Sequence, residues 1–286
     1  MTISTLAWVT CREARGLDED EDLALAALAR RGVTVDVVDW DDPDVEWSTY
    51  DRVALRSAWD YAERLPQFVE WLTRVDATTD LINPLPAVLW SLDKQYLRAL
   101  DDAGVPITPT DFVSPGRAPV FPPGKFIVKP AVGAGSRGAS SYGPTQHDAA
   151  AVHVHRLHEA GQTVLVQPFV ASVASDGELP LVFLSGKFSH AASKRVTVPE
   201  AGEIGELFAA ETNAAHTATA EQIGVARAAM DVVTQRFGPL PYGRVDLMRA
   251  DDGTSQVLEI ELVEPSLFLP YADDGAADRL ATALTG

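Results

Sequence analysis

Three acidic residues near the end of the chain lie at alternate positions of two segments that read as β-strands. Asp246 lies in residues 243–248, and Glu259 and Glu261 lie in residues 258–261. Because strand side chains alternate between faces, all three can point to one side of a sheet. Carboxylates gathered among Val, Leu and Ile require a cation, and oxygen ligands without His or Cys favour Mg²⁺. The alternative is a solvated sheet face, so a phosphate-binding loop elsewhere in the chain would favour the metal site.

A glycine-rich segment of this kind follows a buried strand pattern. Residues 125–129 read as a strand that ends at Lys129, and the next residues include Gly133, Gly135 and Ser136. Glycine allows backbone N–H groups to approach an anion closely, and the lysine supplies charge. The segment is neither a Walker motif nor a dinucleotide fingerprint. By itself it is a weak signal, since such loops are often simple turns, but together with the acidic residues it predicts a nucleotide site.

The N-terminal residues predict a small parallel sheet. Strand patterns at 5–9, 33–38 and 51–56 enclose helix patterns at 18–30 and 65–75. Ligands of such sheets bind at the carboxyl ends of the strands. The candidate substrate-binding residues at these ends are Thr10, Cys11, Arg56, Ser57, Trp59, Asp60 and Tyr61. For Trp59 and Tyr61, packing is the alternative.

The remaining chain alternates proline-rich breaks with regular patterns. Residues 83–86 and 119–124 are expected to be linkers, because paired prolines break helices and central strands. Helices are expected at 92–103, with Ser91 as its cap, and at 147–160, and strands at 163–166, 179–184 and 187–192. Three histidines in the second helix, at 153, 155 and 158, are interpreted as incidental rather than as metal ligands.

Composition narrows the function classes. The 286 residues carry a formal net charge of −18, which argues against binding a nucleic-acid backbone. No apolar run is long enough to predict a membrane span, and no basic region precedes the N-terminal apolar stretch as a secretory signal would require. The single cysteine fits a reducing cytoplasm. A small molecule held in a local cationic pocket is the expected substrate.

The ordered motifs resemble those of the ATP-grasp superfamily over residues 80–270, with the spacing of D-alanine–D-alanine ligase and glutathione synthetase-like members. They are residues 92–94, 127–130, 167–170, 178, 194–195, 243–246 and 258–261. Residues 9–13, 56–61 and 259–268 look like the D-cycloserine synthetase branch, whose members close O-ureido-D-serine into a ring using ATP. The resemblance implies a mixed α/β (α+β) fold in three parts. These are an N-terminal parallel-sheet domain (1–90), a small central lid domain (91–170) and a C-terminal antiparallel-sheet domain (171–286).

The resemblance also implies roles for individual residues. Phosphates would be held by Lys94, Lys129 and the loop of Gly133, Gly135 and Ser136. Gln167 and the backbone of Phe169 and Val170 would contact adenine, and Glu178 the ribose. Asp246, Glu259 and Glu261 would bind two Mg²⁺ ions, and Arg244 would act on the transferred phosphoryl group or the oxyanion, with Lys194 or Arg195. Glu264 is a candidate for a substrate ammonium group, or simply follows the metal strand, and Ser266 is a further substrate candidate.

Two positions depart from the usual ATP-grasp pattern. Related ligases commonly have Asn where this chain has Glu261, and Glu where it has Gln167. The amide of Gln167 can still accept a hydrogen bond from the adenine amino group. The extra charge of Glu261 is expected to alter metal affinity.

The sequence thus predicts an ADP-forming carboxylate–amine ligase that activates a small amino acid as an acyl phosphate. Ring closure is the leading hypothesis, and intermolecular amide ligation is the second. A non-catalytic nucleotide-binding regulator is the alternative of another class. Residues 196–213 are expected to form a lid that excludes water. A homodimer is possible, because dimers are common in the superfamily.

Overall fold

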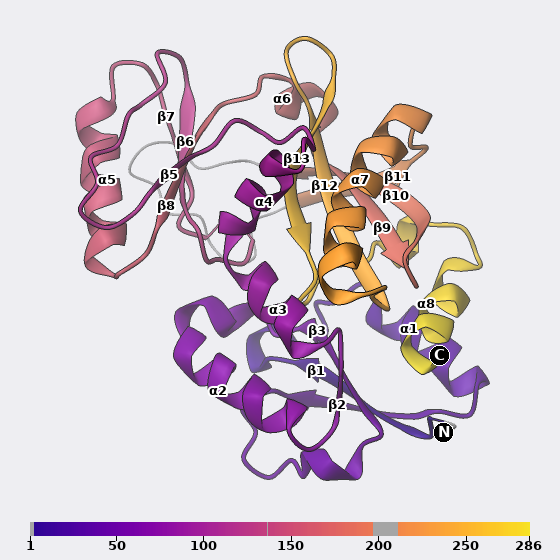
Figure 1. Ribbon diagram of the computed structural model, residues 1–286. Coiled ribbons are helices and arrows are strands. Elements are labelled where there is room, and N and C mark those ends of the chain that lie inside the picture. The colour runs from indigo at the N-terminus through magenta and orange to yellow at the C-terminus, as the bar shows by residue number, and fades with distance from the viewer. Residues whose placement is uncertain (1–2, 136, 197–210) are drawn as a thin grey trace.

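The computed structural model describes residues 3–135, 137–196 and 211–286, and Figure 1 shows three sheets joined by short helices. The fold is α/β, with a parallel N-terminal sheet, a small central sheet and a larger antiparallel sheet, as the sequence predicts. The three sheets fall within the predicted domain ranges, whose exact boundaries stay a prediction. No helix in these described ranges is long and apolar enough to cross a membrane.

The N-terminal sheet has the strand order β2-β1-β3-β4, and all its pairs are parallel. Its strands are β1 (Thr5–Thr10), β2 (Thr34–Asp39), β3 (Arg52–Ser57) and β4 (Asp80–Ile82). Leu6 and Trp8 of β1 pack toward α1 (Glu21–Arg30) and the C-terminal helix α8 (Ala276–Thr285), whereas Ala7 and Val9 pack toward α2 (Leu65–Asp76). Because both faces are buried, polar residues at the strand ends are drawn into the interior.

The connection to the central part differs from the predicted linker and helix. Pro84 precedes a helix, α3 (Leu85–Leu92), and Pro86 lies in its first turn, where a missing N–H costs no hydrogen bond. Ser91 therefore ends a helix rather than beginning one. The predicted helix at 92–103 is interrupted, because Asp93 accepts a hydrogen bond from the backbone N–H of Gln95 and caps a 3₁₀ turn, η4 (Lys94–Tyr96). A short helix, α4 (Leu97–Asp102), follows.

The central sheet is small and antiparallel, in the order β5-β8-β6-β7. Its strands are β5 (Asp111–Val113), β6 (Phe126–Pro130), β7 (Ser140–Tyr142) and β8 (Val164–Pro168), and α5 (His147–Glu159) covers one face. The glycine-rich segment connects β6 to β7. Its conformation is therefore set by two adjacent strands of one sheet.

The third sheet has the order β11-β10-β9-β12-β13 and is antiparallel. Its strands are β9 (Leu179–Leu184), β10 (Lys187–Val196), β11 (Glu211–His216), β12 (Tyr242–Arg249) and β13 (Ser255–Glu261). The helices are α6 (Ser172–Asp176), which contacts β10 and β12, and α7 (Ala220–Phe237), which covers one face (Figure 1). Gly243 allows this packing, since a Cβ there would lie 2.9 Å from the Met230 methyl group of α7.

Two further expectations concern the segment after β9. Strand β10 extends to Val196, beyond the predicted end at residue 192, so Lys194 and Arg195 lie within a strand and point to opposite sides. Of the expected lid, residues 197–210 lie outside the described residues, and Glu211–His216 form the edge strand β11.

Candidate active site

The acidic residues of β12 and β13 form a compact cluster. Antiparallel pairing sets Asp246 opposite Glu259, and Arg244 opposite Glu261. Oxygen atoms of the three carboxylates lie within 4.8 Å of one another. The common face predicted from the sequence is therefore present, and the donor set consists only of hard oxygen atoms.

Arg244 holds this cluster together. Its Nε and Nη2 donate to the two carboxylate oxygens of Asp246, at 2.7 and 2.9 Å, and Nη2 also lies 2.5 Å from Glu261 Oε1. Its Nη1 donates to the backbone oxygen of Ser266, at 2.9 Å. Planar, two-point contact fixes the guanidinium orientation. Glu261, which stands where related ligases commonly have Asn, is thus a direct partner of Arg244.

Two lysines approach the cluster from different elements. Lys94 of η4 donates to the backbone oxygen of Gly133, at 2.9 Å, and its Nζ lies 3.4 Å from Glu259 Oε2. Lys194 of β10 lies 2.8 Å from Glu178 Oε2 and 3.9 Å from Asp246 Oδ2. The Lys94 contact ties the glycine-rich segment to the acidic strands. Cations and acids thus alternate across the site.

The pKa values follow from burial and from these neighbours. Burial raises the pKa of Glu261 to about 8, although Arg244 opposes the change. Burial acts the same way on Glu259, but Lys94, Lys129 and Lys194 outweigh it and lower its pKa to about 2. The pKa of Lys129 is lowered by burial. Burial also lowers the pKa of Lys194, but Glu178 and Asp246 outweigh it and raise that pKa above its ordinary value.

One pocket lies between the central sheet and the third sheet. The predicted nucleotide residues that line it are Lys94, Lys129, Gly133, Gly135, Gln167, Phe169, Val170 and Glu178, together with Glu259 and Glu261. Gln167 Nε2 donates to Thr110 Oγ1 at 2.8 Å, which orients the amide. The N–H of Phe169 already donates to Lys125 O, so its carbonyl is the backbone group that can serve a ligand. Ser136 lies outside the described residues.

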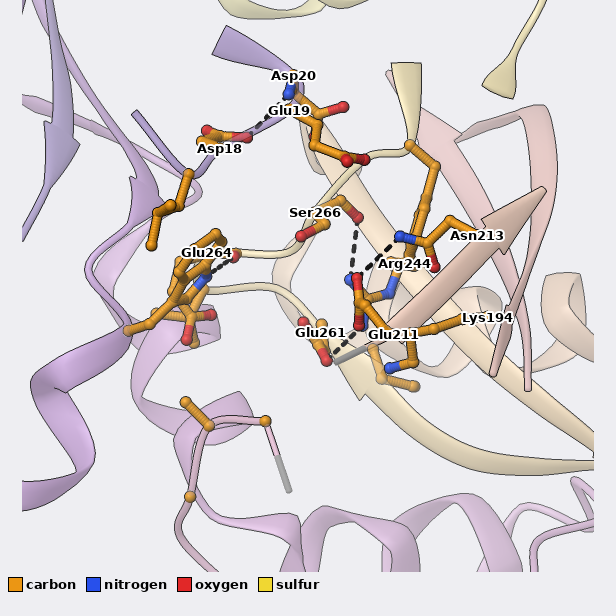
Figure 2. Close-up of a pocket in the computed structure, with 18 of the residues that line it drawn as sticks. Asp18, Glu19, Asp20, Lys194, Glu211, Asn213, Arg244, Glu261, Glu264 and Ser266 are labelled. Carbon is orange, nitrogen blue, oxygen red and sulfur yellow. Dashed lines mark hydrogen bonds and ion pairs between the residues drawn. The ribbon is translucent and has the colours of Figure 1, made fainter. Parts of the chain in front are cut away.

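A second pocket, of about 350 Å³, lies between the N-terminal sheet and the third sheet (Figure 2). Five residues predicted to bind substrate or act in catalysis line it: Arg244, Trp59, Tyr61, Glu264 and Ser266. The two pockets share the residues Lys94, Gly133, Gly135, Lys194, Glu211 and Glu261. They therefore meet where the two lysines and the acidic cluster lie.

Several predicted substrate residues do not line either pocket among the described residues. They are Thr10, Cys11, Arg56, Ser57 and Asp60. Thr10 accepts a hydrogen bond from Ser57 Oγ at 2.7 Å, and Asp60 accepts one from Trp40 Nε1 at 2.8 Å. Arg56 is fully buried between the Trp8 and Tyr242 rings. Both faces of the N-terminal sheet are covered, so these side chains contact other residues of the protein instead of lining a pocket.

The structure separates Lys194 from Arg195, which the sequence analysis left as alternatives, and it adds pocket residues that the sequence analysis missed. Lys194 lines both pockets, whereas Arg195, the next residue of the strand, is exposed and lines neither. Asp246 is fully buried beneath Arg244 and lines neither pocket. Residues that sequence reasoning missed also line the second pocket: Asp18, Glu19, Asp20, Glu211 and Asn213. The acidic residues 18–22 were the available signal for this part of the pocket. They were interpreted as the first turn of a helix, but the helix begins only at Glu21.

The arrangement of three sheets around a lysine-rich and acidic junction defines the ATP-grasp class of ligases. D-Alanine–D-alanine ligase from Bacillus anthracis has the same fold, with a TM-score of 0.65 at 13% identity over 98% of this chain and 96% of that one. A RimK-domain ATP-grasp protein from Sphaerobacter thermophilus gives a TM-score of 0.65 at 17% identity, over 99% of this chain and 100% of that one.

More specific similarities identify the family. The cycloserine biosynthesis protein DcsG of Streptomyces lavendulae is 39% identical over 292 residues, which cover 98% of this chain and 97% of that protein. The crystal structure of D-cycloserine synthetase DcsG matches with a TM-score of 0.89 and 38% identity, over 99% of both chains. The model for the N-terminal domain of D-cycloserine synthetase DcsG matches residues 6–83. The chain belongs to the D-cycloserine synthetase family and is an ATP-dependent ligase that forms C–N bonds.

Proposed function

We propose that this protein uses ATP and Mg²⁺ to activate the carboxylate of O-ureido-D-serine and close it into the ring of cycloserine. The observation that carries the proposal is the junction of the two pockets at Lys94, Lys194 and Glu261. A phosphoryl donor in one pocket and a carboxylate in the other would meet beside these charges. Relatives named for cycloserine biosynthesis and D-cycloserine synthesis support the choice of substrate.

The nucleotide would occupy the pocket beside the central sheet. Lys129 and Lys94 would neutralise its phosphates, and Gln167 and the Phe169 carbonyl would face adenine. Glu178 would accept from the ribose hydroxyl groups. Phosphoryl transfer depends mainly on charge neutralisation and in-line positioning, so it requires no serine or cysteine nucleophile.

The carboxylates fit Mg²⁺ because they offer only oxygen donors and lie within 4.8 Å of one another. Glu259 and Glu261 line the nucleotide pocket and would hold the metal, with Asp246 behind them. Two ions are the number we propose. The metal would neutralise the charge on the transferred phosphoryl group.

Activation would proceed by attack of a substrate carboxylate oxygen on the γ-phosphorus, with ADP leaving. The substrate's ureido nitrogen would then attack the acyl carbon of the acyl phosphate, lose its proton and release phosphate. Arg244 would stabilise the oxyanion of that addition, since its guanidinium faces the second pocket. Water would then hydrolyse the carbamoyl group from the ring nitrogen, giving carbon dioxide and ammonia. Trp59 and Tyr61 would exclude water during activation.

The size of the second pocket supports ring closure over intermolecular ligation. Its volume is about 350 Å³, which suits one small amino acid. Intermolecular ligation would need space for a second reactant beside the first. The two reactions differ in product mass, so they are separable by experiment.

The test is release of ADP with Mg²⁺, ATP and O-ureido-D-serine, with products identified by mass spectrometry. We expect cycloserine to appear in proportion to ADP, and Glu259→Gln to lower the rate by about 100-fold or more because a ligand and a charge are lost. The exposed Glu70 provides a matched control, Glu70→Gln. ATP binding without any cycloserine would refute the proposed substrate, and a product joined to a second amine would indicate intermolecular ligation.

A further inference from the structure

The substrate pocket is electrically asymmetric. Figure 2 shows Arg244 and Lys194 on one side of it, beside Glu211 and Glu261, whereas the side across from them carries Asp18 and Glu264. The cationic side adjoins the nucleotide pocket, through Lys194. The acidic side is formed by the loop before α1 and by the segment after β13. A ligand with one negative and one positive end would be oriented by such a pocket.

Asp18 is the most informative residue on the acidic side. It is 8% exposed and lines the pocket. Its Oδ1 accepts the backbone N–H of Asp20, at 3.0 Å, whereas its Oδ2 has no hydrogen-bond partner within the described part of the chain. A buried carboxylate oxygen without a partner is costly. A donor supplied by a ligand would remove that cost.

The neighbouring Asp20 shows what a satisfied structural carboxylate looks like here. It accepts the backbone N–H groups of Leu267 and Leu269, the latter at 2.7 Å, and lies 3.5 Å from Arg56 Nη2. Asp20 therefore anchors the chain after β13 and has its partners within the protein. Asp18 differs from Asp20 because its Oδ2 has no hydrogen-bond partner within the described residues.

Glu264 faces the same pocket from the opposite segment. It is 6% exposed, and its backbone oxygen accepts from Trp59 Nε1 at 3.3 Å, which fixes the residue beside an aromatic wall. Burial raises the pKa of Glu264 to about 7 and that of Asp18 to about 6. Arg56 favours the charged form of Asp18 and also lies beside Asp20, whereas Lys94, Arg244 and Arg56 favour the charged form of Glu264. Burial outweighs these cations at both acids, so a further cation would stabilise their charged forms.

We propose that Asp18 and Glu264 bind the α-ammonium group of the amino-acid substrate and thereby select α-amino acids over carboxylic acids that lack the amine. The inference rests on the proposed function. A primary ammonium offers three donors, so it can satisfy Asp18 Oδ2 and Glu264 together. It also supplies a positive charge beside both carboxylates. The substrate carboxylate is then directed to Arg244 and Lys194, where activation would occur.

The decisive comparison uses two substrates and three variants. Wild type, Asp18→Asn, Glu264→Gln and a control, Asp22→Asn, are assayed for ADP release with O-ureido-D-serine and with its analogue that has hydrogen in place of the α-amino group. Asp22 is an exposed acid of the same run and does not line the pocket. The KM for ATP and the urea unfolding midpoint are measured for each protein.

We expect Asp18→Asn to raise the KM for the amino acid by about 10- to 100-fold, the size of a lost charge-assisted hydrogen bond, while the KM for ATP changes less than about twofold. Glu264→Gln should act in the same direction, and Asp22→Asn should behave as wild type. Wild type should favour the amine-bearing substrate over the analogue, and Asp18→Asn should lose most of that preference.

The outcomes separate this inference from the proposed function. If wild type turns over O-ureido-D-serine but Asp18→Asn and Glu264→Gln keep its KM and its preference, the ammonium assignment is wrong. If wild type releases no ADP with O-ureido-D-serine, the proposed function fails first. If Asp18→Asn does not fold, Glu264→Gln decides by the same preference.

Discussion

Acid should loosen the central sheet through His153. This residue of α5 is 4% exposed, and its Nδ1 lies 2.9 Å from the Tyr142 hydroxyl of β7. Burial, together with Arg156, lowers its pKa from 6.5 to about 4, although the Gly138 backbone opposes the change. The unfolded state therefore binds the proton more readily than the folded state. Stability is fully present above pH 6.5 and is lost as pH falls toward 4.

The magnitude follows from the two pKa values. Between 6.5 and about 4 the full linkage is about 3 kcal/mol, of which about 2 kcal/mol is lost by pH 5. That corresponds to about a 30-fold loss of protection against opening. Because β6 and β7 flank the glycine-rich segment, the KM for ATP should rise over the same interval.

Hydrogen exchange of the β6 and β8 amides, corrected for intrinsic rates, measures this opening at pH 7 and pH 5. His153→Gln keeps a neutral polar side chain at both pH values, so its protection should change far less with pH. His155→Gln on the same helix is the matched control, since His155 is exposed. Equal pH dependence in wild type and His153→Gln would refute the reasoning.

Two further predictions concern single side chains. Burial raises the pKa of Cys11 to about 11, so iodoacetamide should label the native protein at pH 7 much more slowly than the urea-unfolded protein; equal rates would contradict the buried thiol. Lys194→Gln should lower kcat by about 100-fold, whereas Arg195→Gln should change it less than about threefold, because only Lys194 lines the pockets. Steady-state ADP release measures both, and similar losses would contradict the assignment.

Local patterns predicted well the two strands that carry the acidic cluster. Alternation in β12 and β13 placed Asp246, Glu259 and Glu261 on one face, because a period of two is a property of the strand itself. The parallel N-terminal sheet followed from its strand and helix periods. In contrast, the prolines near residue 85 were interpreted as a break, although proline at a helix start is favourable. Whether these prolines break the chain or begin a helix depends on how α3 packs, which the periodicity of the sequence does not show.

The candidate substrate residues were harder to predict. The carboxyl ends of parallel strands indicate where a pocket can lie, but not which side chains reach it. Arg56 was the natural carboxylate ligand by type, yet it is buried between Trp8 and Tyr242, and its Nη2 donates to the backbone oxygen of Pro265 at 2.8 Å. Its charge is used by the buried Asp20. That assignment depends on contacts between residues as far as 209 positions apart in the chain, which no local pattern contains.

Similar long-range contacts explain how two segments far apart in the sequence form the second pocket. Asn83 donates to the backbone oxygens of Tyr242 and Leu262, at 3.0 and 2.8 Å, and so joins the end of the N-terminal sheet to β12 and the chain after β13. The Tyr242 hydroxyl lies 2.9 Å from the Val263 oxygen. Buried polar contacts of this kind are costly to break, so they fix relative position. Glu264, which directly follows this joint, is therefore held in a fixed position relative to β12, which carries Arg244 and Asp246.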